Sequence, residues 1–272
     1  MSAPLVLELG LQATSVTERR FGGLARLYGI HGATRIRAAH VVVVGVGGVG
    51  SWTVEALARS GVGRLTLIDL DHVSESNINR QIHALDDTLG MAKVEALRQR
   101  ITHINPDCVV NCIEAFVEPS NWPGILGDTD VDAVVDACDQ IKAKTAMAAW
   151  AIKKHVIFIT VGAAGGKRHA HKVDIDDLCH TSHDPLLAKL RYNLRREHGA
   201  AREGQKIGVA CVFSREAVAL PDASCNIPNH GPVDGSLNCS GYGSVVSVTA
   251  TFGLCAAGWV IDQISSAPLP SL

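Results

Sequence analysis

The sequence is 272 residues long, which suits one α/β domain with an appended lobe. With 47 % apolar and 19 % charged residues it has ample material for a core, which excludes a disordered chain. Its formal net charge of -2 excludes a global electrostatic pull toward nucleic acid or membrane, so any RNA contact must come from a local patch.

The cysteine and N-terminal patterns indicate the cellular compartment. The eight cysteines form no C-x-x-C pair, which disfavours a structural zinc site and indicates buried thiols in a reducing environment. The first twenty residues have no basic start followed by a long apolar run, as an export signal would. We therefore expect a cytoplasmic protein.

Strands and helices alternate along the first 160 residues. A helix over 18–28 precedes the apolar run 40–44, which predicts a strand buried on both faces. The glycine-rich segment that follows turns the chain into a further helix. The elements expected next are helices at 49–59, 91–103 and 141–154 and strands at 64–69, 108–113, 133–136 and 156–160. Because such alternation needs crossover connections, we expect a Rossmann-like α/β fold with a doubly wound, mainly parallel sheet.

The remainder of the chain is less regular. It predicts a strand and turn at 167–180, a helix at 185–198, a strand at 207–214 and a loop at 221–240. The apolar segment 244–265 has the length of a membrane helix, but its scattered Ser, Thr and Gly and the terminal Asp262 favour a buried helix. We expect a single domain over 1–272, made of a nucleotide-binding core (1–166), a substrate-side insertion (167–243) and a C-terminal buried helix (244–265).

The glycines between the first strand and its helix fit the pattern G-x-G-x-x-G. They are Gly45, Gly47, Gly48 and Gly50, and Asp69 ends the second strand where a ribose hydroxyl would be bound. Glycines let phosphate approach the N–H groups of the helix N-terminus. NAD, FAD and ATP proteins share this pattern, so it does not by itself identify the nucleotide.

A polar stretch over 69–81, followed by Gly90 and Lys93, distinguishes ATP from a nicotinamide cofactor. A dehydrogenase that binds a nicotinamide cofactor needs no such polar loop. Arg80 and Lys93 place two cations near one helix N-terminus, enough to neutralise a triphosphate and the charge that develops as pyrophosphate leaves. The alternative is a pair of solvated surface charges. We therefore expect ATP rather than a nicotinamide cofactor.

The motifs G-x-G-G-x-G, L-I-D-L-D, S-x-N-x-x-R-Q, G-x-x-K and D-A-C-D appear in this order and resemble those of the ubiquitin-activating-like adenylating superfamily, the ThiF type. The resemblance implies bound ATP and Mg²⁺, catalytic roles for Arg80 and Lys93, and Asp139 as the residue that positions the metal. Asp136 is either a direct contact or a strand-end support. The nucleotide-binding residues that the resemblance implies are Gly45, Gly47, Gly48, Gly50, Asp69, Asp71, Asn77, Asn79, Arg80, Gln81, Lys93 and Asp136.

Further segments, including 20–23, 79–85, 162–166 and 211–214, are similar to the bacterial tRNA threonylcarbamoyladenosine dehydratases over nearly the whole chain. This similarity implies ATP-dependent cyclisation of N6-threonylcarbamoyladenosine in tRNA, by activation of its threonine carboxylate. It also implies a homodimer in which a catalytic Arg26 reaches the partner's ATP site. The sequence leaves open a monovalent cation and a sulfur-transfer partner such as a cysteine desulfurase.

Two other functions fit part of the pattern. An adenylating activator of a ubiquitin-like sulfur-carrier protein would use a reactive thiol such as Cys211 or Cys239, but such activators commonly have the two C-x-x-C pairs that this sequence lacks. The other is a nucleotide-binding scaffold without catalysis. For tRNA binding, segment 189–206 offers six basic side chains, Lys189, Arg191, Arg195, Arg196, Arg202 and Lys206, against Glu197 and Glu203.

Overall fold

Seven strands form one sheet that is parallel except at one edge. In this computed structural model, which describes residues 4–202, 204–222, 224 and 242–266, the strand order is β3-β2-β1-β4-β5-β7-β6. Only β6 runs antiparallel, against β7. The strands are β1 (His40–Val44), β2 (Arg64–Ile68), β3 (Val109–Ile113), β4 (Ala133–Asp136), β5 (Ile157–Val161), β6 (Val173–Asp177) and β7 (Ala210–Ser214). Chain order reverses between β1 and β4, which is where sheets of this type bind ligands.

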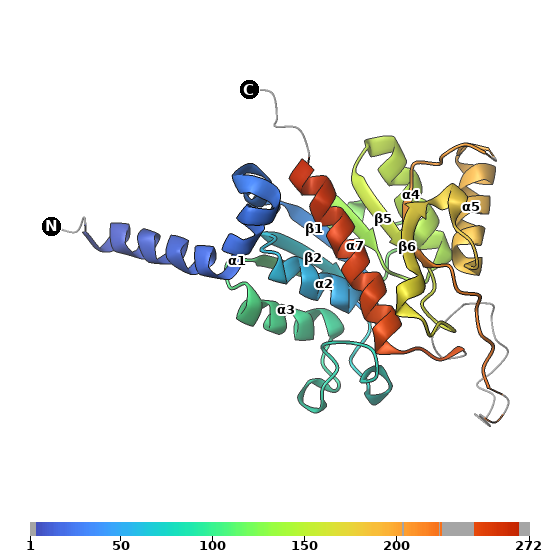
Figure 1. Ribbon diagram of the computed structural model, residues 1–272, viewed down its shortest axis with the longest axis horizontal. Coiled ribbons are helices and arrows are strands. Elements are labelled where there is room, and N and C mark those ends of the chain that lie inside the picture. The colour runs from blue at the N-terminus through green and yellow to red at the C-terminus, as the bar shows by residue number, and fades with distance from the viewer. Residues whose placement is uncertain (1–3, 203, 223, 225–241, 267–272) are drawn as a thin grey trace.

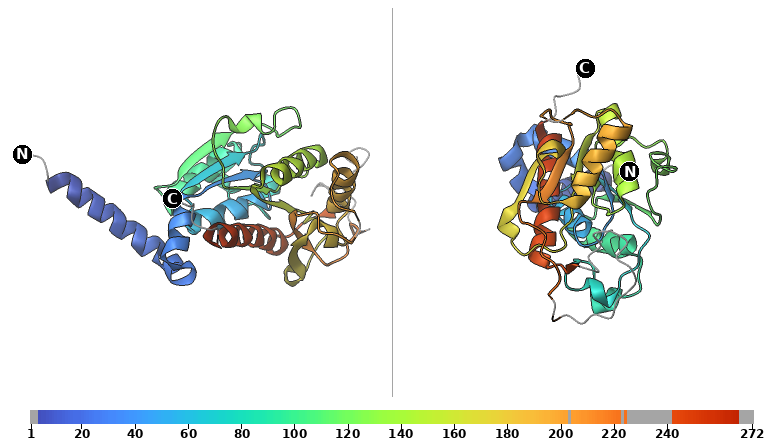
Figure 2. Two further views of the ribbon diagram at one scale, coloured as in Figure 1. Left: turned by 90° about the horizontal axis from the view of Figure 1, so that it is seen from above. Right: turned by 90° about the vertical axis from the view of Figure 1, so that its right-hand side faces the viewer.

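Helices cover both faces of the sheet (Figures 1 and 2). Val41 and Val43 of β1 pack into the core under α2 (Gly50–Arg59), α3 (Lys93–Ile104) and α7 (Val246–Ser266). Val42 and Val44 point to the opposite core, under α4 (Ile141–Lys154) and α5 (Pro185–Glu197). Because successive strand residues face opposite sides, a strand covered on both sides has to be apolar throughout. The predicted doubly wound α/β fold is confirmed.

The N-terminal helix is much longer than the expected 18–28. α1 spans Pro4–Ala38 and changes direction at Gly29, whose φ of 72° lies in the left-handed region. Its first part projects away from the body (Figures 1 and 2). Its last turns return to the sheet, where Arg35 Nε donates to the carbonyls of Ile264 and Ser265 at 3.2 and 3.1 Å.

The apolar C-terminal segment is a buried helix, as predicted. α7 crosses α2 so closely that a Cβ on Gly253 would lie 2.4 Å from the carbonyl oxygen of Val49. Thr53 Oγ1 also donates to the Gly253 carbonyl at 3.2 Å. Across the part of the chain that the structure describes, no helix combines the length and the apolar character that crossing a membrane requires.

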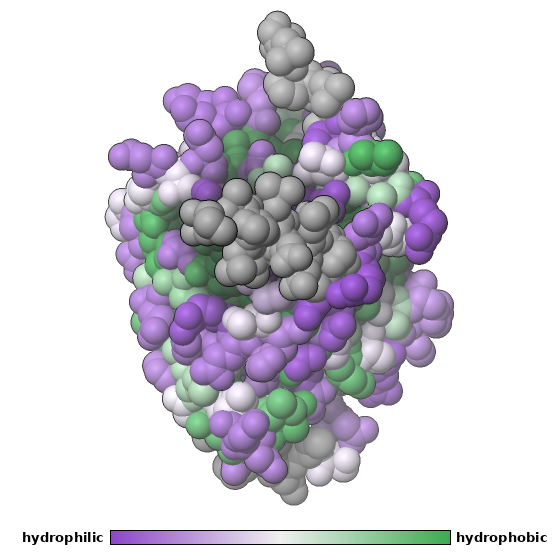
Figure 3. Space-filling view, turned by 90° about the vertical axis from the view of Figure 1, so that its left-hand side faces the viewer, coloured by the Kyte–Doolittle hydropathy of each residue, from purple (hydrophilic) through white to green (hydrophobic). Residues whose placement is uncertain are grey.

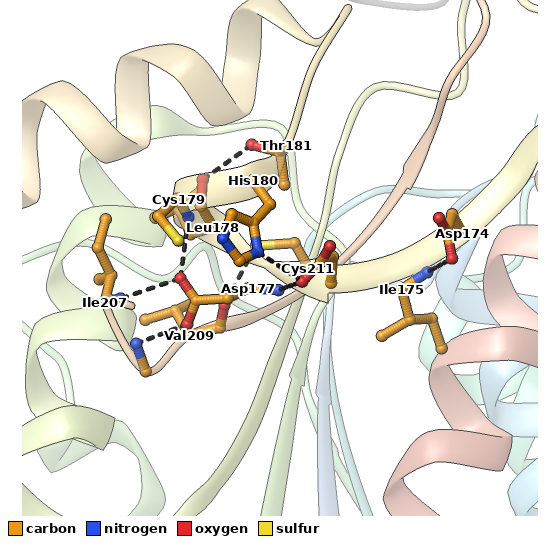
Figure 4. A network of polar contacts seen from close by, with 12 residues as sticks. Asp174, Ile175, Asp177, Leu178, Cys179, His180, Thr181, Ile207, Val209 and Cys211 are labelled. Carbon is orange, nitrogen blue, oxygen red and sulfur yellow. Dashed lines mark hydrogen bonds and ion pairs between the residues drawn. The ribbon is translucent and has the colours of Figure 1, made fainter. Parts of the chain in front are cut away.

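The described part of 167–243 adds the strands β6 and β7 to the same sheet and packs α5 on one of its faces. Figure 4 shows the contacts that join the end of β6 to the segment that leads into β7. The Asp177 carboxylate accepts the N–H groups of Cys179, Ile207 and Gly208 at 2.9, 2.9 and 2.7 Å. Burial raises the pKa of Asp177, but these hydrogen bonds outweigh it and lower the pKa below its usual value. Most of the expected loop 221–240 lies outside the described residues. Short 3₁₀ helices complete the fold: Glu75–Asn77, Asp86–Thr88, Gly124–Leu126, Ala170–Lys172 and Leu178–His180.

Candidate nucleotide-binding site

A pocket of about 440 Å³ opens at the carboxyl ends of the central strands. Its volume is in the range of small-molecule sites. It lies where the strand order reverses, between the turn after β1 and the loop after β4. The pocket brings together these predicted residues: Gly45, Gly47, Gly48, Asp69, Asp71, Asn77, Arg80, Gln81, Lys93 and Asp139.

The glycine turn has two different physical requirements. Gly45 has φ 79°, and a Cβ there would lie 2.8 Å from the backbone nitrogen of Cys138. Gly50 does not line the pocket; a Cβ there would lie 1.8 Å from the Gly45 carbonyl oxygen, so Gly50 permits the helix to pack on the turn. Gly48 faces the pocket, and its missing side chain leaves room beside Arg80. The open N-terminus of α2 is the anion-binding end of the helix.

These contacts predict opposite outcomes for two alanine substitutions. Gly50→Ala is expected to lower the free energy of unfolding by at least about 3 kcal/mol, because backbone atoms cannot move aside. Gly48→Ala should change it by less than about 1 kcal/mol, since the nearest atoms, all of the Arg80 side chain, would lie at 3.4–3.6 Å, which is ordinary van der Waals contact. Urea denaturation and ATP titration separate the two. A Gly48→Ala protein with unchanged ATP affinity would remove Gly48 from the pocket's binding surface.

Asp69 links the end of β2 to the glycine turn. Its carboxylate accepts the N–H of Val46 at 2.8 Å and the N–H of Asp71 at 2.9 Å, and the side chain is almost buried. Burial raises the pKa of Asp69, while Lys93 and the two N–H groups oppose the rise. The carboxylate is therefore held in one orientation, with lone pairs left over for a ribose hydroxyl.

Lys93 reaches the pocket from the first residue of α3. Its Nζ lies 2.8 Å from Asp71 Oδ2, and its backbone N–H donates to the Asp71 carbonyl at 3.0 Å. A bridge between His72 and Ala92 holds the same two segments together. The Lys93 side chain is 7 % exposed and that of Asp71 54 %, so the ammonium is desolvated and close to the space where phosphate charge would lie.

Arg80 is fixed by its backbone and unpaired at one nitrogen. Its carbonyl accepts from Trp52 Nε1 at 2.9 Å, and its guanidinium donates to the Ser76 carbonyl at 2.6 Å and to Asn79 Oδ1 at 2.9 Å. Buried Arg80 Nε and Gln81 Oε1 have no hydrogen-bond partner among the described residues. Buried polar groups without partners are rare, and here both belong to residues that line the pocket.

The two asparagines of the polar loop have different positions. Asn77 lines the pocket, and its Oδ1 accepts the N–H of Ser74 at 3.1 Å, which closes the first turn of the loop. Asn79 does not line the pocket; its Nδ2 donates to the Ser244 carbonyl at 3.0 Å and so ties the loop to the start of α7. Asn79 thus contacts Arg80 from outside the pocket lining.

Asp136 lies under the pocket floor. It is fully buried with Lys144, whose Nζ is 3.0 Å from Asp136 Oδ2, and it accepts from Thr160 Oγ1 at 2.7 Å. Burial lowers the pKa of Lys144, but Asp136 outweighs it and raises the pKa. This geometry favours the strand-end support over a direct nucleotide contact. Asp139, three residues beyond the buried Asp136, is exposed at the rim.

Several pocket residues had no assigned role from sequence. Phe116 follows the edge strand β3 and is half exposed at the rim, and nothing in the local pattern marks it. Segment 162–165 follows β5, where a Cβ on Gly162 would lie 2.1 Å from Asp184 Oδ2. Asp184 in turn accepts the Ala163 N–H at 2.8 Å and caps α5 through the Leu187 N–H at 3.0 Å. The pocket wall and α5 are thus one unit.

Arg26 is outside this pocket. It is exposed on α1 and is not part of the pocket lining, so within one chain it makes no contribution to the site. A larger hollow of about 670 Å³ lies between α1, α2 and α3, beside Arg20, Phe21 and Arg100. Its described lining includes neither the glycine turn nor the carboxylate of Asp69. The nucleotide-binding features converge on the smaller pocket.

A doubly wound sheet with a glycine turn, a ribose carboxylate and two cations at its switch point defines a nucleotide-binding protein of the Rossmann-like class. The chain belongs to the ThiF family, whose sequence profile matches residues 22–272. It is 41 % identical to the tRNA threonylcarbamoyladenosine dehydratase of Haemophilus influenzae over 91 % of this chain and 94 % of that protein, and 41 % identical to the Escherichia coli protein of the same name over 90 % and 93 %. The crystal structure of the E. coli dehydratase TcdA in complex with ATP superposes with a TM-score of 0.81 and 40 % identity, covering 91 % of this chain and 94 % of that one.

Proposed function

We propose that this protein catalyses the ATP-dependent dehydration of N6-threonylcarbamoyladenosine in tRNA to its cyclic form. The observation that carries the proposal is the similarity to named dehydratases over nine tenths of the chain, together with a pocket lined by Arg80 and Lys93 beside the glycine turn. Because the substrate is a tRNA, the proposal places the reaction in the cytoplasm.

The chemical problem is a carboxylate that must become an acylating agent. A carboxylate is a poor electrophile because its leaving group would be oxide, and ATP supplies a far better leaving group when bound. We assign phosphate binding to Gly48, Arg80 and Lys93 and ribose binding to Asp69. Arg80 and Lys93 stabilise the negative charge that grows on the departing phosphates. The carbamoyl group that attacks is tethered beside the carboxylate, so proximity supplies much of the rate and no protein nucleophile is required.

We assign the Mg²⁺ ligand to Asp139. Mg²⁺ keeps several waters and binds through one or two carboxylates plus substrate phosphates. The described residues include no cluster of three His, Cys, Asp or Glu side chains able to hold a metal alone, and Asp139 is an exposed carboxylate at the pocket rim. The donor set therefore fits an ion shared with phosphate. Binding of a monovalent cation and of a sulfur-transfer protein stay predictions of the resemblance.

The test is direct. Purified protein, ATP and Mg²⁺ are incubated with tRNA carrying threonylcarbamoyladenosine, and the digested nucleosides are weighed by mass spectrometry. Loss of one water from that nucleoside, dependent on ATP, is the expected result. An activator of a sulfur-carrier protein would instead give pyrophosphate exchange that needs a protein ending in Gly-Gly, and a scaffold would bind ATP without turnover.

The described cysteines give no support to the thiol-transfer alternative. Cys211 is fully buried on β7, and burial raises its pKa well above the usual value, so it is a poor nucleophile. Cys138 lines the pocket, but burial and the neighbouring Asp136 raise its pKa in the same way. Cys239 lies outside the described residues.

We also propose a homodimer in which Arg26 completes the partner's pocket. α1 projects from the body, and Leu27 and Ile30 beside Arg26 are 73 % and 75 % exposed. The face that carries α1 has apolar side chains scattered among hydrophilic ones (Figure 3). These features fit a helix that packs on a second copy.

Mixing two inactive variants tests whether Arg26 of one subunit acts in the pocket of the other. Arg26→Ala and Arg80→Ala proteins, unfolded and refolded together, are expected to recover about a quarter of wild-type activity, because half of the dimers are mixed and each has one intact site. No recovery on mixing, or full activity of Arg26→Ala alone, would contradict this role. Sedimentation of the wild-type protein measures the dimer itself.

A further inference from the structure

One exposed face of α5 has the composition of a single-stranded RNA contact. Pro185, Lys189, Tyr192 and Arg196 are all exposed and follow one another at intervals of four, three and four residues, which places them on one side of the helix. The stripe is about 16 Å long at 1.5 Å per residue. The buried side of the same helix carries Leu187, Leu190 and Leu194.

Tyr192 is the centre of this stripe. It is 52 % exposed, with Lys189 Nζ 5.3 Å and Arg196 Cζ 5.4 Å from its ring centroid. A hollow of about 340 Å³ opens beside the ring, between Ala188 and Arg195. An aromatic face with a cation on each side is the arrangement that stacks an unpaired base while neutralising its flanking phosphates.

Two arginines of the basic segment 189–206 are engaged in hydrogen bonds within the chain. Arg191 donates to the carbonyls of Leu178 and Thr181 at 2.9 and 3.1 Å, and Arg195 Nε donates to the Ala201 carbonyl at 3.0 Å. These two arginines stabilise neighbouring loops through their backbone carbonyls. Lys189 and Arg196 remain on the stripe, with Arg196 also paired to its neighbour Glu197. Glu203 lies outside the described residues.

The stripe starts at the candidate site. Leu186, in the first turn of α5, lines the nucleotide pocket, and the Asp184 carboxylate joins that turn to the pocket wall at Ala163. α5 therefore leads outward from the pocket mouth as a rigid extension. Figure 1 shows it at the end of the molecule opposite α1.

We infer that the Lys189–Tyr192–Arg196 face of α5 binds the unpaired nucleotides that flank the modified adenosine, with Tyr192 stacked on a base and the two cations on backbone phosphates. This inference rests on the proposed function. Sequence-specific contacts to RNA are made mainly in loops, whose bases are free to stack on aromatic side chains. In a chain with a net charge of -2, such a local surface is what RNA binding requires.

The test measures binding of tRNA carrying threonylcarbamoyladenosine to the full chain as salt is varied. Lys189→Glu/Arg196→Glu is expected to weaken binding by at least about tenfold and to reduce the salt slope by between about one and two. Tyr192→Leu should weaken it about tenfold with an unchanged slope, and Tyr192→Phe, which keeps the ring, should bind like wild type. ATP affinity should be unchanged in all of them.

The matched control is Lys153→Glu/Lys154→Glu. It makes the same change in net charge on exposed residues at the far end of α4, and its effect on tRNA affinity should be at most about threefold. If the α5 variants bind tRNA as well as this control does, the inference is overturned. Failure of the wild type to form cyclic product would instead overturn the proposed function, because the binding measurement needs no turnover.

Discussion

Arg80→Ala is expected to slow ATP-dependent cyclisation by about 100-fold or more while weakening ATP binding far less. The reason is geometric. The Arg80 carbonyl is held by Trp52, and its guanidinium is oriented by the Ser76 carbonyl and Asn79, so the cation is positioned in the pocket lining before any ligand arrives. A preorganised donor acts most strongly on the charge that appears in the transition state. Single-turnover rates at saturating ATP, beside calorimetric ATP affinity, measure the two effects.

Two further variants sharpen the result for Arg80. Arg80→Lys keeps the charge but loses the planar fork, so it should recover only part of the rate. Arg98→Ala removes an arginine of similar size from the exposed surface of α3, where it pairs with Glu95, and should leave turnover unchanged. If Arg80→Ala and Arg98→Ala turn over at the same rate, Arg80 has no part in the chemistry.

The fold and the nucleotide end of the site follow from local patterns. Strands buried on both faces are apolar at nearly every position, and this pattern predicts the strands 40–44 and 133–136, whose polar members are His40 and Asp136 at their ends. A glycine turn between a strand and a helix has few uses, and Gly45 and Gly48, which the pattern assigns to such a turn, line the pocket. No comparable sequence pattern predicts the rest of the pocket lining. Phe116, Leu186 and segment 162–165 reach the pocket through the order of strands in space, which no short sequence window contains.

The position of a residue within a sequence motif also does not predict whether its side chain faces the pocket. Gly50, Asn79 and Asp136 lie within the predicted motifs, yet none of them lines the pocket: Gly50 packs on the turn, Asn79 tethers the polar loop and Asp136 pairs with Lys144. Arg191 and Arg195 likewise belong to a basic segment but hold carbonyls of their own chain. The antiparallel β6 at the sheet edge departs from the alternating pattern of the first half: no α-helix separates it from β5, because only parallel strands need a crossover connection.

Lys144→Met is expected to lower the free energy of unfolding by about 3–5 kcal/mol, because it leaves the Asp136 carboxylate buried without a counter-ion. Both side chains of this pair are 0 % exposed, and Lys144 Nζ also donates to Thr160 Oγ1 at 3.0 Å. Since β4 ends at Asp136, the backbone that carries Cys138 and Asp139 to the pocket should loosen with it. Urea denaturation measures the loss, and a raised apparent dissociation constant for ATP reports the effect on the site.

The double variant Asp136→Leu/Lys144→Met separates the cost of the unpaired charge from the cost of lost packing. Replacing a buried ion pair by apolar side chains is often neutral or stabilising, so the double variant should be more stable than Lys144→Met alone. Lys142→Met, on an exposed position of the same helix, is the matched control and should change stability by less than about 0.5 kcal/mol. If the double variant is as unstable as the sum of its two single changes, Lys144 stabilises the pocket floor by packing and not by neutralising Asp136.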